Sequence, residues 1–171
     1  MNLKSSALYA GIDDSNHGNF PEIWAAVFSN NPEDILPRKY QGRRDNLKLL
    51  THNISFRDYR FLEVSREESE RLEKSLLARV VVSLITDHRL HNHYNKLELV
   101  IDGRVTREDK KRMRESLRGF QTGANIKGIC KVGNYKYPKI LAIADELAHH
   151  LFCDCSREQT AQDEHKIYLL R

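Results

Sequence analysis

The sequence contains little of what would mark a secreted, membrane or disordered protein. Its three cysteines, Cys130, Cys153 and Cys155, are odd in number and lack the spacing of a disulfide framework, so we expect no disulfides and a reducing compartment. The longest apolar run, "VVVSLI", is much shorter than the roughly 20 residues that a membrane-spanning helix needs, and the first residues lack the apolar core of a signal peptide. We therefore expect a cytoplasmic protein without a membrane partner.

Glycine and proline are also scarce, at eight and four residues in a chain of 171. Disordered and low-complexity chains are richer in these residues and poorer in apolar ones, which make up 40% of this sequence. A chain of this length can bury a core without disulfides or metal. We predict a single domain over residues 1–171.

Motifs for nucleotide cofactors and for covalent catalysis are absent from the sequence. It has no Gly-rich phosphate-binding loop, and no Ser or Cys stands in the context of a nucleophile elbow. Kinase, dehydrogenase and esterase functions therefore have no support in the sequence.

Positive charge is concentrated in two segments, although the net charge is only +4. An insertion over residues 30–52 interrupts the hydrophobic periodicity and is rich in Arg and Lys, and a second basic segment precedes the last predicted helix. Such clusters either form a solvated surface or bind a polyanion. The residues that we predict to contact a nucleic-acid backbone, without reading its bases, are Arg38, Lys39, Arg43, Arg44, Lys136 and Lys139.

The hydrophobic pattern predicts three strands followed by alternating helices and strands. One helix over residues 66–90 starts with a capping box of Ser65 and Glu68, another follows the cap formed by Thr106 and Asp109, and the last starts at Pro138. The expected strands are 7–13, 22–29, 56–64, 96–102 and 125–132, of which the first two form a hairpin. The predicted fold class is α/β, with a mixed five-stranded sheet of three antiparallel strands and then two parallel ones, flanked by helices.

Acidic residues stand at the ends of two of these strands. Asp13 ends the first strand and Asp102 ends the fourth. If the two strands pair in parallel, the two residues lie about 4.8 Å apart, at the end of the sheet where α/β proteins bind ligands. Asp145 lies on the otherwise apolar last helix, where an acid is costly unless it is paired. Hard divalent cations prefer carboxylate oxygens, and two such ions can promote hydrolysis of a phosphodiester bond.

These motifs resemble those of the ribonuclease H-like superfamily of nucleases. "GIDDSNHG" is similar to the Gly-x-Asp-Glu-x-x-x-Gly opening of type 2 ribonucleases H, "LVIDG" to the second acidic strand of that family, and "YPKILAIADELAHHL" to a late alanine-rich helix that carries a further acid in related families. Asp14 stands where the family has Glu, and Ser-Asn-His stands where an Ala-Gly-Arg segment would recognise the scissile phosphate of a hybrid. Because a clear Gly-Arg-Gly loop and a substrate tyrosine are also missing, cleavage specific for ribonucleotides is not expected.

The resemblance, which covers roughly residues 7–153, implies a divalent-metal-dependent nuclease that hydrolyses phosphodiester bonds of DNA or RNA, with exonuclease action as one option. It also implies Asp13, Asp14, Asp102 and Asp145 as ligands of two Mg²⁺ or Mn²⁺ ions. His149 lies one helical turn after Asp145 and is a candidate for proton transfer to the leaving group.

Other assignments stay open at this point. A non-catalytic nucleic-acid-binding module on the same fold, or a hydrolase or transferase of small phosphates, would use the same residues. Zinc could bind at His88, His91 and His93 or at "HHLFCDC", although a solvated helix end and a buried thiol pair are simpler accounts of these segments. The apolar terminal segment "KIYLLR" leaves docking onto a second copy of the chain open.

Overall fold

The structure, a computed structural model, describes residues 5–15, 20–39, 56–86, 94–120, 123–129 and 136–155. Five strands form the main sheet: β1 (Ser5–Ser15), β2 (Glu22–Ser29), β4 (Phe56–Val64), β5 (Tyr94–Asp102) and β6 (Ala124–Ile129). A second, two-stranded sheet pairs β3 (Pro37–Lys39) with β7 (Lys136–Pro138). The helical elements are η1 (Pro32–Ile35), α2 (Arg66–Leu72), η3 (Glu73–Ser75), α3 (Leu76–Ile85), α5 (Arg107–Ser116) and α6 (Lys139–Cys155).

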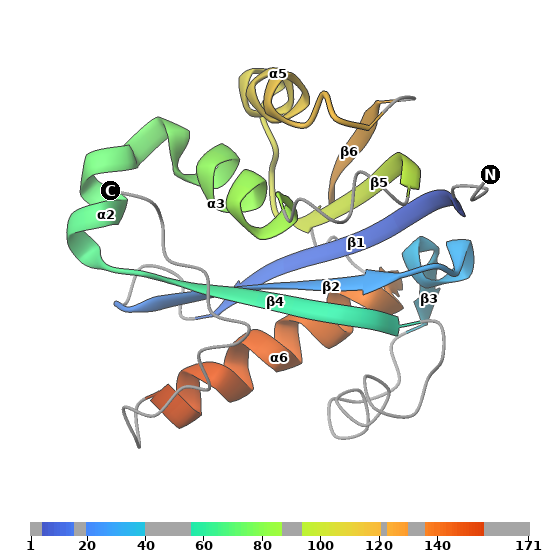
Figure 1. Ribbon diagram of the computed structural model, residues 1–171. Helices are drawn as coiled ribbons and strands as arrows, with labels where there is room; N and C mark the ends of the chain where they lie inside the picture. Colours follow the sequence, from blue (N-terminus) through green and yellow to red (C-terminus); the bar gives the residue numbers. More distant parts are fainter. Residues whose placement is uncertain are drawn as a thin grey trace.

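The strands of the main sheet lie in the order β4-β2-β1-β5-β6. β1 pairs antiparallel with β2, and β2 pairs antiparallel with β4, whereas β5 is parallel to both β1 and β6. This is the predicted α/β fold, with an open mixed sheet flanked by helices (Figure 1). The first strand of the chain therefore lies at the centre of the sheet, with strands from both halves of the sequence beside it.

Helices cover both faces of the sheet, so its central strands are buried on both sides (Figure 1). All eight residues of β2 are buried, which explains its continuous apolar sequence. On one face, residues such as Leu8 and Leu99 pack with Val81 of α3 and Met113 of α5. On the other face, α6 covers β1 and β2 with its buried positions Leu141, Ala144 and Ala148, as their spacing predicts.

The single helix predicted over residues 66–90 is wrong, because the segment is divided into α2, η3 and α3. The predicted capping box of Ser65 and Glu68 is present at the start of α2. The α-helix stops at Glu73, whose φ of 35° and ψ of −111° cannot continue it, and the Ser75 hydroxyl donates to the Leu72 carbonyl at 2.8 Å. The break lets α3 turn and lay its apolar face on the sheet, where it ends at Ile85; residues 87–90 lie outside the described ranges.

Among the described residues, no helix combines the length and the apolar composition needed to cross a lipid bilayer.

Candidate active site

Asp13 and Asp102 occupy neighbouring positions at the carboxyl ends of two central strands. The parallel register of β1 and β5 pairs Ile12 with Ile101, so the next residue on each strand is one of the two acids. Since neighbouring strands are about 4.8 Å apart, the two backbones bring these residues side by side. The predicted parallel pairing of the first and fourth main-sheet strands is confirmed.

Both acids face the side of the sheet that α6 covers. Side chains alternate between the faces of a strand, and Ile12 and Ile101 belong to the apolar cluster beneath α3 and α5. Asp13 and Asp102 therefore lie on the opposite face, where Ala25, the cross-strand neighbour of Asp13, packs with residues of α6. Asp13 is only 2% exposed, and a carboxylate buried to this extent needs hydrogen-bond donors or a cation to offset its desolvation.

α6 approaches β1 closely at Gly11, two residues before Asp13. A Cβ atom on Gly11 would lie 2.9 Å from the backbone carbonyl carbon and oxygen of Ile140, so only glycine fits here. From this crossing, α6 runs in the same general direction as β1 (Figure 1). Asp145 is half-buried and lies about 7.5 Å further along the helix axis than Ile140. A third acid is thus carried by the helix that covers the face of Asp13.

Asp14 lies on the other face of the sheet. It is the neighbour of Asp13 in the chain, so the alternation of strand side chains directs the two apart. Its cross-strand partner is Trp24, which belongs to the apolar cluster beneath α3 and α5. The backbone N–H of Asp14 donates to Oδ1 of Asp13 at 2.9 Å. Asp14 as a metal ligand stays a prediction.

The donor set suits one hard divalent ion better than two. Within the described part of the chain, no three His, Cys, Asp or Glu side chains form a group that could hold a metal ion. Mg²⁺, however, is commonly bound through one or two carboxylates, with water and substrate phosphate as its other ligands. Asp13 and Asp102 are oxygen donors from adjacent strands, at the edge of the sheet where α/β proteins generally bind ligands, and so are of the type and number that this requires.

The two predicted basic segments meet in the small sheet. β3 and β7 pair Arg38 with Tyr137 and Lys39 with Lys136, although almost a hundred residues separate them in the chain. Three of the residues predicted to contact nucleic acid therefore come from two adjacent strands. Arg43 and Arg44 lie outside the described residues.

Lys139 has an acidic neighbour that the sequence did not single out. Its Nζ lies 3.7 Å from Oδ1 of Asp34, a residue of η1 that is 2% exposed. Oδ2 of the same carboxylate accepts a hydrogen bond from the hydroxyl of Ser29 at 2.6 Å. Asp34 precedes an apolar pair in an ordinary turn sequence, so no sequence signal identified it as buried.

His149 is exposed on α6, with its Nε2 3.8 Å from the sulfur of Cys153 one turn later. Its role in proton transfer stays a prediction. Cys153 is not part of a disulfide. The alternative zinc ligands His88, His91 and His93 lie outside the described residues.

A scan against protein-family models finds no match to this chain, and a search of curated proteins finds none either.

Proposed function

We propose that the chain is a divalent-metal-dependent nuclease that hydrolyses phosphodiester bonds of DNA or RNA. The observation that supports it best is the adjacency of Asp13 and Asp102 at the carboxyl ends of parallel strands, beneath the helix that carries Asp145. The order of elements also agrees with the ribonuclease H-like superfamily, to which we propose that the chain is distantly related. We further propose that the protein acts in the cytoplasm.

In this proposal, the two acids at the ends of β1 and β5 have a defined task. Asp13 and Asp102 would hold Mg²⁺ or Mn²⁺ at the sheet edge, whereas Asp145 on α6, which the sequence predicted as a further ligand, does not form a three-residue metal group with them. When bound, the ion supplies charge stabilisation and an activated water for hydrolysis. Arg38, Lys39, Arg43, Arg44 and Lys136 contact the phosphate backbone of the substrate. Lys139, which was predicted with them, is instead given a structural role beside Asp34.

The first prediction concerns Asp102→Asn, which replaces one carboxylate oxygen with an amide of the same shape. We expect cleavage to fall by about 100-fold or more, because a metal ligand is weakened. The free energy of unfolding should be unchanged or higher, since repulsion between Asp13 and Asp102 is relieved. The measurement is digestion of end-labelled single-stranded and duplex DNA, RNA and hybrid in Mg²⁺ and Mn²⁺, and the ladder of products also distinguishes exonuclease from endonuclease action.

Glu70→Gln is the matched control for this substitution. Glu70 is exposed on α2, so the same carboxylate-to-amide change there should leave cleavage unaltered. Parent-level cleavage by Asp102→Asn would refute the assignment of the site.

A second candidate function is a non-catalytic nucleic-acid-binding module on the same fold. The position of Asp14 on the opposite face from Asp13 favours it, because this leaves fewer acids for a two-ion site. Metal-independent binding without any cleavage in Mg²⁺ or Mn²⁺ would favour this module over the nuclease.

A further inference from the structure

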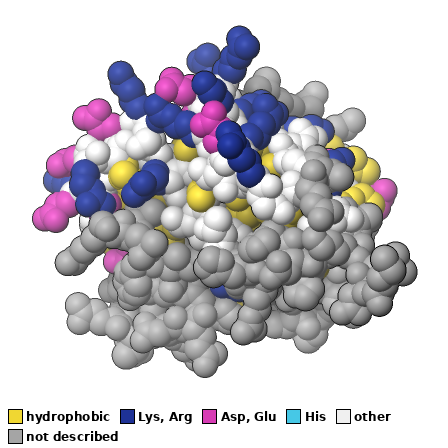
Figure 2. Space-filling view, turned by 45° about the horizontal axis from the view of Figure 1, so that its top comes forward, with side chains coloured by type: hydrophobic (Ala, Val, Ile, Leu, Met, Phe, Trp, Pro, Cys, Tyr) yellow, Lys and Arg dark blue, Asp and Glu magenta, His cyan; other side chains and the backbone are white. Residues whose placement is uncertain are grey.

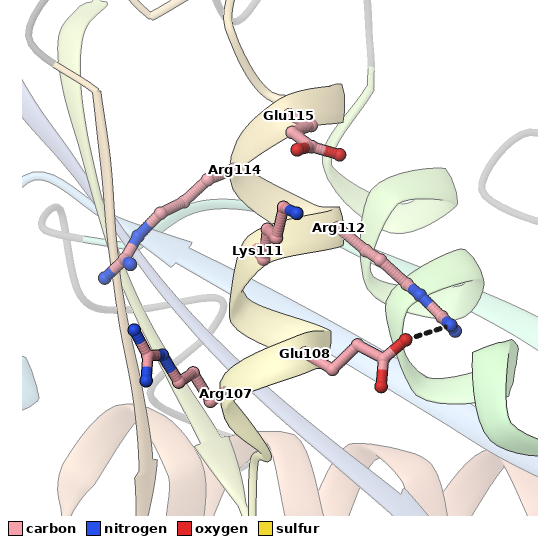
Figure 3. A pocket seen from close by; sticks show the side chains of 6 residues that line it. All are labelled: Arg107, Glu108, Lys111, Arg112, Arg114 and Glu115. Carbon is pink, nitrogen blue, oxygen red and sulfur yellow. Dashed lines mark hydrogen bonds and ion pairs between the residues drawn. The ribbon is translucent and has the colours of Figure 1, made fainter.

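α5 has two flanks of different charge. Arg107, Lys111 and Arg114 are four and three residues apart, which places them on one side of the helix. We call these three residues the basic flank of α5. The other side carries Glu108, Arg112 and Glu115. Figure 3 shows the two flanks: Arg107 and Arg114 extend toward β6, whereas Glu108 and Arg112 extend toward α3.

The contacts of each flank differ in the same way. On the side of α3, Arg112 forms an ion pair with Glu108 and donates to the backbone carbonyl of Lys74 at 3.3 Å, so its charge has a partner. On the basic flank, Arg107 and Lys111 are exposed and have no ion pair with any described residue. Arg114 makes a 3.4 Å hydrogen bond from Nε to the carbonyl of Ala124 in β6. The basic flank therefore presents two cations, Arg107 and Lys111, that no acid of the described ranges pairs with.

Positive charge continues around this helix. Arg104 lies in the connection from β5 to α5, and Arg118 follows the end of the helix; both are exposed. Figure 2 shows Lys and Arg side chains gathered over this face of the molecule, with Asp and Glu side chains interspersed among them. The six residues of the two flanks also line one open hollow of the surface. A concentration of cations around a shallow surface is typical of proteins that bind polyanions.

We propose that the basic flank of α5 binds the phosphate backbone of a nucleic acid, as a contact surface separate from the residues of β3 and β7. The choice of partner rests on the proposed function; the existence of the surface does not. α5 starts five residues after Asp102 but packs on the face of the sheet opposite to the one that carries the acids, so the flank is also separate from the acidic site.

The spacing and chemistry of the flank fit phosphates. Arg107 and Arg114 are about 10.5 Å apart along the helix axis, which corresponds to about three base-pair steps of 3.4 Å along the axis of a duplex that lies parallel to α5. Two of the three residues are Arg, whose planar guanidinium group matches phosphate oxygens in a bidentate manner. A membrane surface fits less well, because the apolar side of α5 is already used: Met113 and Leu117 are buried in the protein core.

The test compares two triple variants that each remove three positive charges. Arg107→Gln/Lys111→Gln/Arg114→Gln changes the basic flank. Arg71→Gln/Lys74→Gln/Arg79→Gln changes exposed cations of α2, η3 and α3, where Glu67, Glu68, Glu70 and Glu73 are interspersed. Binding to labelled duplex and single-stranded DNA of mixed sequence is measured by fluorescence anisotropy in EDTA, so that cleavage does not contribute.

We expect the flank variant to bind duplex DNA about 10- to 100-fold more weakly, with a salt dependence shallower by about 0.9 for each phosphate that it no longer neutralises. The control variant should bind close to the parent level. Thermal unfolding of each variant shows whether it is folded. The double variant Arg107→Gln/Lys111→Gln is also measured, because it retains the hydrogen bond from Arg114 to Ala124.

Equal losses in the two triple variants, or no loss in either, would overturn the proposal, because the binding would then follow net charge or another surface. Binding of the parent chain to phosphatidylserine vesicles but not to DNA would also overturn it and identify a membrane surface. If Asp102→Asn cleaves normally while the flank variant loses DNA binding, the proposed nuclease function fails and this surface stands. If Asp102→Asn is inactive while the flank variant binds DNA like the parent, the proposed nuclease function stands and the proposal for this surface fails.

Discussion

The absence of a side chain at Gly11 sets the distance between β1 and α6. Gly11→Ala would place a methyl group 2.9 Å from the backbone carbonyl of Ile140, so the helix or the strand must move. We expect a loss of about 1–3 kcal/mol in the free energy of unfolding, measured by urea denaturation. If the proposed nuclease assignment holds, cleavage falls further than stability alone would explain, because α6 covers the face of β1 that carries Asp13 and small displacements of catalytic groups are costly.

A second substitution tests the cause of this effect. Ile140→Ala in the Gly11→Ala background removes the clash with Cγ2 of Ile140 but leaves the carbonyl atoms that also clash. Full recovery of stability in the double variant would show that the side chain, and not the backbone of α6, limits the approach.

Lys139 lies beside a buried acid, so its substitution should lower the stability of the protein. Lys139→Met keeps most of the length of the side chain and removes the charge 3.7 Å from Asp34. We expect the free energy of unfolding to fall by about 1–3 kcal/mol, because the buried carboxylate loses a cation, and the affinity for DNA to stay near that of the parent. Denaturation of Lys139→Met, Asp34→Asn and the double variant gives the coupling between the two residues. The reverse pattern, stable folding with weakened DNA binding, would return Lys139 to the set of residues that bind phosphate.

At the residue scale, the sequence predicts which residues stand at the strand ends better than it predicts which face of the sheet their side chains occupy. The adjacency of Asp13 and Asp102 follows from two strand ends and one pairing rule, and the structure has this parallel pairing. The family motif groups Asp14 with Asp13 as two successive acids, although the alternation of side chains in a strand sends successive residues to opposite faces. The burial of Asp34 depends on the packing of η1 against α6, which no local pattern encodes.

At the element scale, the break between α2 and α3 occurs at a strained residue. Glu73 has a φ of 35°, a conformation that glycine adopts at less cost than other residues. Glu73→Gly should therefore raise the free energy of unfolding by about 1 kcal/mol, since relief of strain outweighs the extra entropy that glycine has in the unfolded chain. Chemical denaturation of Glu73→Gly and Glu73→Ala separates the backbone effect from loss of the carboxylate, and equal stabilities would exclude strain as the cause.

The elements themselves were largely predictable, because their ends are encoded locally. Ser65 and Thr106 cap α2 and α5 as expected, and β2 covers the predicted residues 22–29. The break at Glu73 was not predictable, since Leu72 and Leu76 continue the helical spacing across it. An apolar stripe shows which side of a segment is buried, but it does not show where the backbone changes direction.

At the scale of the whole molecule, the sheet order was predictable and the arrangement of its charged surfaces was not. Pairing rules lead from the element sequence to a mixed sheet with the first strand beside the fourth. The pairing of β3 with β7 joins two basic segments that are far apart in the sequence. The spacing of four and three residues in the sequence indicates that the basic flank of α5 lies on one side of a helix. The sequence does not indicate that this side is exposed, because that depends on which side of the helix packs on the rest of the protein.

The central position of β1 has a consequence for synthesis of the chain. β2 and β4 emerge from the ribosome soon after β1 and can complete an antiparallel meander, yet the other edge of β1 pairs with β5, which is made only after residues 65–93. During that interval, the nascent chain presents an unpaired edge of a central strand, and such edges are templates for intermolecular pairing. The same topology that brings two acids together thus leaves the second edge of β1 unpaired until β5, which ends at Asp102, has been synthesised and can pair with it.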